Sequence, residues 1–468
     1  MTRSGSSREG SPPDHVTPYD RFAWNDSEIE RFLLDGHHED ELTAYFGRRE
    51  HRELVRLAQQ GARRPLEKDA PCVFVVPGIM GSQLGTRRQR PLPDDILWLD
   101  PIDIEVGKLA QLRLSERAPI VPLGVVLYSY LRLKLHLRAS GFATVFHDYD
   151  WRLGVDELGE AFARRLRSVP ARRLMIVAHS MGGLVSRAAL AQPDLRHVER
   201  LVLLGTPNFG SFAPLQALRG TYSVVRKIAR LVATGSAEAL ARDIFNGFPS
   251  LYQMLPVAGQ NGGPDLFEPS QWPRMGPLPD VALLRNARRI HERLAPPDER
   301  VTSIVGIRQE TVTAATRRDD EFVYTVTRHG DGTVPAVSAT LPGARNLYAA
   351  VAHSDLTRDP VVAAAITDVL RRGSTRRLPT EWRSASAALA RIGDNRLRRM
   401  HAGKVNWAAL EPDERREFLQ NLNEPPRLRL RIPSRAAPSR ARAAGRRKKQ
   451  LRRSPSARGP RNGRTRTR

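Results

Sequence analysis

The sequence lacks several features that mark whole classes of protein. Cys72 is the only cysteine among 468 residues, which excludes an intrachain disulfide and a cysteine-based zinc site. The first residues show no apolar stretch typical of a signal peptide, and no run approaches the roughly 18 apolar residues of a membrane span. We therefore expect a cytoplasmic protein without a transmembrane segment, with a peripheral position at a membrane and signal-independent export left open.

Acidic residues are missing from one end of the chain. The formal net charge is +25, and the stretch from Arg427 to Arg468 contains 17 Lys and Arg but no Asp or Glu. The same stretch has no aromatic residue, so the stacking that single-stranded nucleic acid favours is not expected. We expect the tail 427–468 to bind an anionic membrane surface. Non-specific nucleic-acid binding and a tail without a partner are the alternatives.

The rest of the sequence is typical of a folded protein, with 40% hydrophobic and 27% charged residues overall. Between residues 71 and 374, segments typical of strands alternate with segments typical of helices. This alternation predicts an α/β domain with a mostly parallel, doubly wound sheet. The expected strands are Val73–Val76, Ala143–Phe146, Leu174–Val177, Leu201–Leu204, Val301–Ile307, Phe322–Val326 and Asn346–Val351.

Five regions are expected along the chain. Residues 18–70 read as a helical extension of two helices, the second carrying Leu42 to Leu57 and ending at Gly61. In the α/β domain the alternation lapses at about residues 210–295, which predicts a helical cap or lid insertion. The regions are 1–17 (disordered), 18–70 (helical), 71–374 (α/β domain), 375–424 (helical appendage) and 425–468 (disordered basic tail).

The strongest chemical signal is Ala178-His179-Ser180-Met181-Gly182. It falls where a buried strand ends and a helix begins, as a nucleophile elbow requires. The sharp turn over Ser180 needs small neighbours two residues away, and Ala178 and Gly182 meet that need. The pattern departs mildly from the commoner Gly-x-Ser-x-Gly. We expect Ser180 to be a nucleophile.

A nucleophilic serine needs a base, and the base needs an orienting acid. Among the histidines that follow Ser180, His353 lies just after an expected strand, and Asp331 follows another in Gly330-Asp331-Gly332. The order serine, acid, histidine is that of α/β hydrolases, so Asp331 and His353 are the expected partners. Asp355 as the acid and His329 as the base are the rivals.

The transition state of acyl transfer needs two convergent N–H groups. One is the N–H of Met181, directly after the nucleophile. The loop Pro77–Ser82 follows the first strand and contains Gly78 and Gly81, so its backbone can approach a substrate. The Ile79 N–H is the expected second donor.

Taken in order, seven motifs resemble the lecithin:cholesterol acyltransferase-like family of α/β-hydrolases, which includes bacterial lipase-like and phospholipase-like members. They are Val76–Ser82, Tyr149–Leu153, Ala178–Gly183, Gly205–Pro207, Pro249–Pro256, Gly330–Val334 and His353–Ser354. The resemblance covers about residues 72–372. It implies a triad of Ser180, Asp331 and His353, oxyanion donors at Ile79 and Met181, and an acyl-enzyme formed from a lipid ester.

The expected function is therefore serine-dependent hydrolysis of a lipid ester, or transfer of its acyl group, without a metal or an organic cofactor. A non-lipid esterase or amidase is the alternative within the enzymes. A protein that binds anionic surfaces or nucleic acid on a hydrolase scaffold is the alternative outside them. The oligomeric state is not predicted. Five residues of the insertion have two possible roles: they line an acyl-binding slot under a lid, or they form the core of the insertion itself. They are Phe248, Leu251, Tyr252, Met254 and Leu255.

Overall fold

The computed structural model describes residues 16–114, 119–171, 173–233, 235–258, 263–383, 388–400 and 403–422. Residues 1–15 and the basic tail lie outside the described residues, so the expectations for both ends of the chain stay predictions. Among the helices that the structure describes, none has the length and apolar character of a membrane span.

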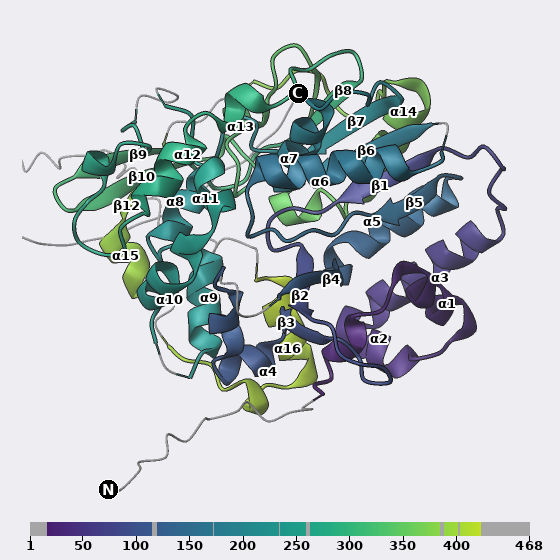
Figure 1. Cartoon of the computed structure of the whole chain (residues 1–468), viewed down its shortest axis with the longest axis horizontal. Coiled ribbons are helices and arrows are strands. Elements are labelled where there is room, and N and C mark those ends of the chain that lie inside the picture. Colours follow the sequence, from purple (N-terminus) through teal and green to yellow (C-terminus); the bar gives the residue numbers. More distant parts are fainter. Residues whose placement is uncertain are drawn as a thin grey trace, which may run out of the picture. The chain divides into compact units, whose positions relative to one another are not determined.

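Six parallel strands form the central sheet, in the spatial order β11, β8, β7, β6, β1, β5 (Figure 1). Each strand carries β-branched and other apolar residues and is largely buried, as expected for a parallel sheet covered on both faces. The strands are β1 (Cys72–Val76), β5 (Ala143–Phe146), β6 (Leu174–His179), β7 (Val198–Leu204), β8 (Val301–Gly306) and β11 (Arg345–Ala349).

Alternate residues of these strands face two separate cores, because successive side chains of a strand point to opposite faces. In β1, Val73 and Val75 pack in one apolar cluster, with residues of the helices α3, α5 and α14. Phe74 and Val76 pack in the other, with α6, α7 and the insertion. Figure 1 shows α6 and α7 lying along the sheet. The covering helices are α3 (Arg48–Ala62), α5 (Leu127–Ala139), α6 (Val155–Ser168), α7 (Met181–Leu190) and α14 (Pro360–Arg372).

Two small antiparallel sheets accompany the central one, in the orders β3-β2-β4 and β12-β10-β9. The expected strand Phe322–Val326 is part of β10, which pairs with β9 and β12 and not with the central sheet. β12 lies in the appendage 375–424 that was expected to be helical. The strands are β2 (Ser82–Thr86), β3 (Asp95–Trp98), β4 (Val121–Val125), β9 (Thr311–Arg318), β10 (Glu321–Thr327) and β12 (Ala390–Gly393).

The N-terminal extension differs in one detail from the expected pair of helices. The second helix is divided at Gly47, where φ is 84°, a backbone conformation that glycine adopts without strain. The elements are η1 (Asp20–Phe22), α1 (Asp26–Asp35), α2 (Glu39–Phe46) and α3. The capping box that begins α1 joins the side chains and backbones of Asn25 and Glu28.

The insertion between β7 and β8 is helical, as predicted. Its elements are α8 (Phe212–Leu218), α9 (Ser223–Leu231), α10 (Ala237–Asp243), η3 (Phe245–Gly247), α11 (Pro249–Gln253), η5 (Pro269–Gln271), α12 (Val281–Ala287) and η6 (Ile290–Arg293). The remaining helices are α4 (Pro101–Glu105), η2 (Lys108–Leu112), α13 (Ala336–Ala339), η7 (His353–Asp355), α15 (Asp394–Arg399), η8 (Trp407–Ala409) and α16 (Pro412–Gln420).

A buried ion pair connects the insertion with the C-terminal region. Arg219, which follows α8, and Asp394, which begins α15, are both fully buried, and Arg219 Nε lies 3.1 Å from Asp394 Oδ2. Arg219 also donates to the carbonyls of Pro273 and Pro277, at 3.1 and 2.7 Å. Tyr324 of β10 donates its hydroxyl to Asp394, at 2.8 Å. The pair therefore connects three segments that are distant in sequence.

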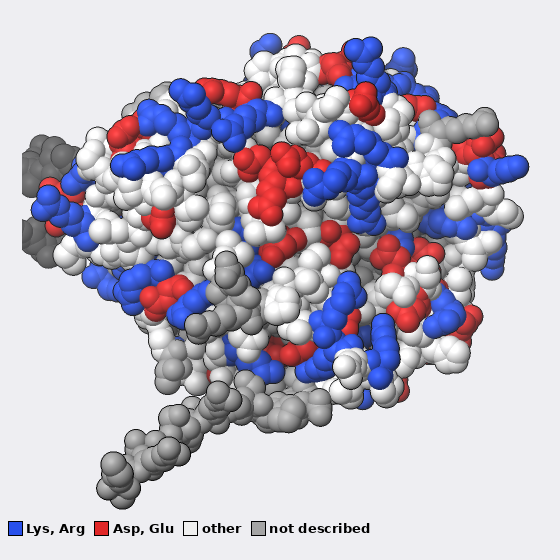
Figure 2. All heavy atoms as spheres, viewed as in Figure 1, with Lys and Arg blue, Asp and Glu red and all other residues white. Residues whose placement is uncertain are grey.

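Surface charge on the described body is mixed. Figure 2 shows Lys and Arg side chains interspersed with Asp and Glu over the face that it presents, with a group of acidic side chains near its centre. This agrees with the sequence, in which most of the excess positive charge belongs to the tail.

Candidate active site

Ser180 occupies a strained turn between β6 and α7. Its φ and ψ are 53° and −126°, a region that costs a residue other than glycine about 1–3 kcal/mol and is found mainly at functional sites. A Cβ at Gly182 would lie 2.3 Å from the Pro77 carbonyl oxygen, and a Cβ at Gly78 would lie 2.8 Å from Ser180 Cβ. Because neither contact is possible, the turn needs glycine at both positions.

Asp331 and His353 form a close pair beside this turn. His353 Nδ1 lies 2.7 Å from Asp331 Oδ2, and the backbone N–H of His353 donates to the Asp331 carbonyl at 2.8 Å. The other carboxylate oxygen accepts the backbone N–H groups of Thr333 and Val334, at 2.9 and 2.7 Å. Asp331 is thereby held as an acceptor, and His353 Nδ1 donates to it, which leaves Nε2 to act as a base.

Asp331 reaches the site by a different route from the expected one. It follows β10, which lies outside the central sheet, because the β9–β10 hairpin intervenes between β8 and this loop. The loop returns to the carboxyl end of β8, where a Cβ at Gly306 would lie 2.4 Å from Asp331 Cβ. His353 begins η7, four residues after β11 ends. The side chains thus meet where the parallel strands end, as in other open α/β sheets.

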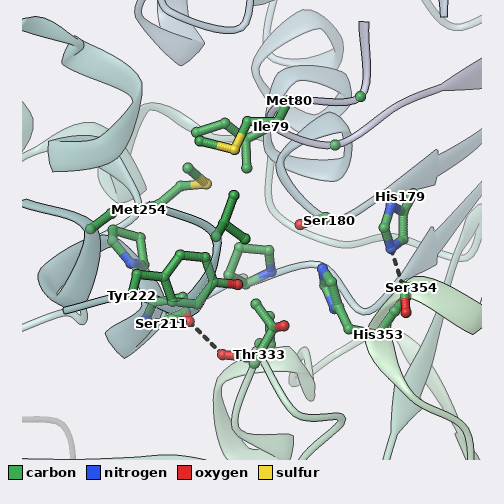
Figure 3. A pocket seen from close by; sticks show the side chains of 18 of the residues that line it. Ile79, Met80, His179, Ser180, Ser211, Tyr222, Met254, Thr333, His353 and Ser354 are labelled. Atoms are coloured by element: carbon green, nitrogen blue, oxygen red, sulfur yellow. Dashed lines mark hydrogen bonds between the residues drawn. The ribbon is translucent and has the colours of Figure 1, made fainter. Parts of the chain in front are cut away.

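Ser180 and His353 line one cavity, of about 870 Å³, and Figure 3 shows both side chains at that cavity. Ser180 Oγ forms no hydrogen bond with the His353 ring in the described part of the chain. Catalytic hydrogen bonds are often longer before substrate binds and tighten in the complex. Asp355 and His329 do not line this cavity, and the His329 ring packs against Trp382, 5.6 Å between centroids.

The expected oxyanion donors lie in two places: Ile79 in the loop after β1 and Met181 at the start of α7. No described residue accepts a hydrogen bond from the backbone N–H of Ile79 or of Met181. Met181 begins α7, so its N–H is one of the first four of the helix, which have no intrahelical partner. The N-terminus of a helix also favours developing negative charge. Both N–H groups therefore remain free to stabilise an oxyanion at Ser180.

Four buried aromatic side chains hold this loop through polar bonds to its backbone. The bonds are Tyr149 Oη to Pro77 O (2.7 Å), Gly78 N to Tyr130 Oη (2.9 Å), Trp98 Nε1 to Met80 O (3.0 Å) and Trp151 Nε1 to Ser82 O (3.1 Å). Preorganised donors cost little reorganisation during a reaction. Trp98 and Tyr130 were not predicted from the sequence, because an aromatic residue in a buried strand or helix gives no sign of its polar partner.

Tyr130 and His179 connect this loop with the backbone of His353. His179 Nδ1 lies 3.0 Å from Tyr130 Oη, and His179 Nε2 lies 3.0 Å from the His353 carbonyl oxygen. A carbonyl only accepts and an N–H only donates. His179 therefore carries its proton on Nε2, Tyr130 donates to Nδ1, and Gly78 donates to Tyr130. Burial, followed by the neighbouring His353, lowers the pKa of His179 well below its ordinary value, which keeps the ring neutral.

The wall of the cavity opposite Ser180 and His353 is mainly apolar. Among the insertion residues singled out in the sequence, Leu251 and Met254 line the cavity. Phe248, Tyr252 and Leu255 are fully buried and lie in the apolar core of the insertion instead. The remaining apolar lining residues include Ile79, Met80, Pro214, Ala217 and Val224. Such a wall fits an acyl chain better than a polar group.

Within the described ranges, no group of three or more His, Cys, Asp or Glu side chains is arranged to hold a metal ion. Cys72 is buried in β1, and burial raises the pKa of its thiol. Its position and protonation therefore make it a poor nucleophile.

Comparisons with known proteins agree with the fold. A family model described as a PGAP1-like alpha/beta domain matches residues 163–275, which span the elbow and much of the insertion. A comparison with curated protein sequences gave no match. The chain has an α/β-hydrolase fold. Membership of the lecithin:cholesterol acyltransferase-like family is a finer statement, which these findings do not reach.

Solved structures with a similar arrangement include the mature Bacillus licheniformis lipase BlEst2, with 14% identity, coverage of 66% of this chain and 96% of that chain, and a TM-score of 0.35. The Tle4–Tli4 complex has 15% identity, with coverage of 65% of this chain and 99% of that chain and a TM-score of 0.41. Phospholipase PlaB from Legionella pneumophila has 11% identity, with coverage of 65% of this chain and 60% of that chain and a TM-score of 0.30.

Proposed function

We propose that the chain is a serine acyl hydrolase that forms an acyl-enzyme on Ser180 and acts on esters with an apolar acyl chain. One observation carries the proposal. The strained Ser180 and His353 line the same cavity, whose opposite wall is apolar, and Asp331 Oδ2 lies 2.7 Å from His353 Nδ1.

In the first half of the reaction, Ser180 Oγ attacks the ester carbonyl carbon while His353 Nε2 accepts the hydroxyl proton. The negative charge moves to the carbonyl oxygen, where the N–H groups of Ile79 and Met181 stabilise it. Asp331 holds the imidazole in the tautomer with its proton on Nδ1 and stabilises the imidazolium. When the carbon–oxygen bond to the alcohol breaks, His353 returns the proton to the departing oxygen.

In the second half, a water or an alcohol attacks the acyl-enzyme, and His353 again takes and returns the proton. Water gives a free acid, and an alcohol gives a new ester. The resemblance to the acyltransferase-like family favours a lipid ester as the acyl donor, and the apolar wall formed by Leu251, Met254 and their neighbours supports an acyl chain there.

Covalent labelling with a fluorophosphonate tests the proposal. The wild type should label, and Ser180→Ala and His353→Ala should not, because the first lacks the nucleophile and the second the base. Esters of p-nitrophenol with acyl chains of increasing length then test the apolar wall, since kcat/KM should rise with chain length. A folded wild type that stays unlabelled, also with detergent or vesicles present, would refute the proposal.

A further inference from the structure

A second cavity adjoins the catalytic one. It measures about 680 Å³, and the two share three lining residues: Ala213, Tyr222 and Thr333. Thr333 belongs to the loop of Asp331, and its backbone N–H donates to the Asp331 carboxylate. The second cavity therefore lies behind the loop that holds the acid of the proposed triad.

Polar side chains without partners distinguish this cavity from the apolar one. Gln216 is 8% exposed, and its amide forms no hydrogen bond within the described residues. Glu310 Oε2 is buried without a hydrogen-bond partner, and no ion pair of Glu310 occurs in the same described part. Both residues line the cavity. Buried polar atoms are nearly always partnered in native proteins, so Glu310 Oε2 points to a ligand that completes it, and the Gln216 amide lines the same cavity as a second polar group for that ligand.

The side of the site on which the cavity lies indicates which part of a substrate it faces. Figure 3 shows Thr333 beside His353 and across the pocket from Ile79 and Met80. The proposed mechanism has His353 protonate the departing alcohol, so the alcohol leaves on the His353 side. The acyl chain then extends along the apolar wall formed by the insertion, and the alcohol extends over Thr333.

The charges of the lining restrict the alcohol further. Arg226 is the cation of the cavity, but it donates to the carbonyls of Met400, at 2.8 Å, and Arg398. Its Nη1 lies 3.7 Å from Glu238. Arg226 is therefore already engaged, whereas the Glu310 carboxylate is not. The lining favours groups that complement a carboxylate, namely hydroxyls or a cationic ammonium, and disfavours an anionic phosphate or carboxylate.

We infer that this second cavity binds the alcohol part of the ester, and that this part is a hydroxyl-rich or ammonium-bearing alcohol recognised by Glu310 and Gln216. The inference rests on the proposed function and assigns the substrate class of the same site.

Octanoyl esters of methanol, glycerol and choline test the inference, because they share one acyl chain and differ only in the alcohol. The ratio of kcat/KM for the choline ester to that for the methyl ester should fall about tenfold or more in Glu310→Gln. The ratio for the glycerol ester should fall about as much in Gln216→Leu, which removes the amide. In the wild type, a higher ratio for the glycerol ester indicates a polyol as the natural alcohol, and a higher ratio for the choline ester indicates an amino alcohol.

Glu299→Gln is the matched control, since Glu299 is exposed and precedes β8 at the end of the sheet away from the site. Its ratios should equal those of the wild type. Glu310 is only half-buried, so its isosteric replacement should fold even where Gln216→Leu does not. If the ratios are unchanged in Glu310→Gln and Gln216→Leu while the methyl ester is still hydrolysed, the inference about the alcohol is overturned and the proposed function stands. A wild type that hydrolyses no ester and takes no fluorophosphonate would overturn the proposed function, and the inference with it.

Discussion

Replacement of Tyr130 by phenylalanine tests whether the path from the oxyanion loop to His353 contributes to catalysis. The change removes one hydroxyl from a residue that is 3% exposed. The Gly78 N–H loses its hydrogen bond of 2.9 Å, His179 Nδ1 loses its hydrogen bond of 3.0 Å, and both groups are left without a partner. Each unpartnered buried polar group costs about 1–3 kcal/mol, so the free energy of unfolding should fall by about 2–6 kcal/mol.

The catalytic effect should be separate from the loss of stability. Tyr130 holds the loop that carries the Ile79 N–H, and a displacement of about 1 Å in a catalytic group can cost 10²-fold in rate. We expect kcat for a p-nitrophenyl ester to fall about 10- to 100-fold. KM should change little, because the apolar wall formed by the insertion stays in place.

Tyr128→Phe is a matched control on the same helix. Tyr128 is also buried, and its hydroxyl donates to the Leu419 carbonyl at 3.0 Å, away from the site. Its removal should lower the stability while kcat per folded molecule is unchanged. Urea unfolding and steady-state kinetics on both variants decide the question. If Tyr130→Phe and Tyr128→Phe keep the same kcat, the path through Tyr130 has no catalytic role.

His179 offers a rescue of the same path. His179→Leu removes both polar atoms of the ring and should lower kcat as Tyr130→Phe does. His179→Gln supplies an amide with one acceptor and one donor, so it can take the Tyr130 hydroxyl and still donate to the His353 carbonyl. Part of the rate should return. Equal rates in His179→Leu and His179→Gln would mean that only the volume of the ring matters.

Three further predictions follow from the described contacts. Asp331→Asn should retain the fold but lower kcat by about 10³- to 10⁴-fold, because the amide favours the wrong tautomer of His353; circular dichroism and ester hydrolysis check both parts, and a loss below tenfold would argue against Asp331 as the acid. Arg219→Met should destabilise the protein by about 3 kcal/mol in urea, because the buried Asp394 loses its nearest cation and keeps the more distant Arg398, whose Nη2 lies 3.9 Å from Asp394 Oδ2. Arg242→Met, which removes an exposed ion pair, should cost less than about 1 kcal/mol. Burial, with Arg165 beside it, lowers the pKa of His147 from 6.5 to about 3, so the unfolded state binds a proton before the folded state does. Its contribution to stability is complete above pH 6.5 and is lost as the pH falls toward 3. His147→Asn keeps an acceptor for Arg165 and should flatten this decline, and an unaltered pH dependence of the unfolding midpoint would contradict the assignment.

The central sheet was readable from the sequence because its signals are local. β1, β6 and β7 are short apolar runs, and each is followed within a few residues by the turn or helix that its flanking residues indicate. In the two small sheets, β10 alone gave such a signal. β2 and β4 contain Gly85, Pro122 and Gly124, which weaken a strand pattern, and their pairing depends on partners about forty residues apart.

The placement of Asp331 shows how a local pattern can be correct while its context is not. The sequence places this residue after a strand, and it does follow β10. Nothing local distinguishes a hairpin strand from a strand of the central sheet, since both carry apolar residues with similar turns. The loop returns to the end of β8 through contacts such as that of Asp331 with Gly306 and the hydrogen bond from Gln309 N–H to the Gly330 carbonyl, 2.9 Å. These contacts depend on tertiary packing.

The Ala-x-Ser-x-Gly pattern of the elbow has a physical explanation that the sequence alone could not supply. The two small residues are not equivalent. Gly182 faces the carbonyls of Val76 and Pro77, where a Cβ would lie 2.8 and 2.3 Å from the two oxygens, so any side chain would displace β1 or the oxyanion loop. Ala178 instead is the next-to-last residue of the buried strand β6, paired with Val76 and Leu203, and its methyl group packs in the apolar core. The position before Ser180 that tolerates alanine is therefore the one that faces the core, and the position after Ser180 must be glycine because the oxyanion loop passes directly over it.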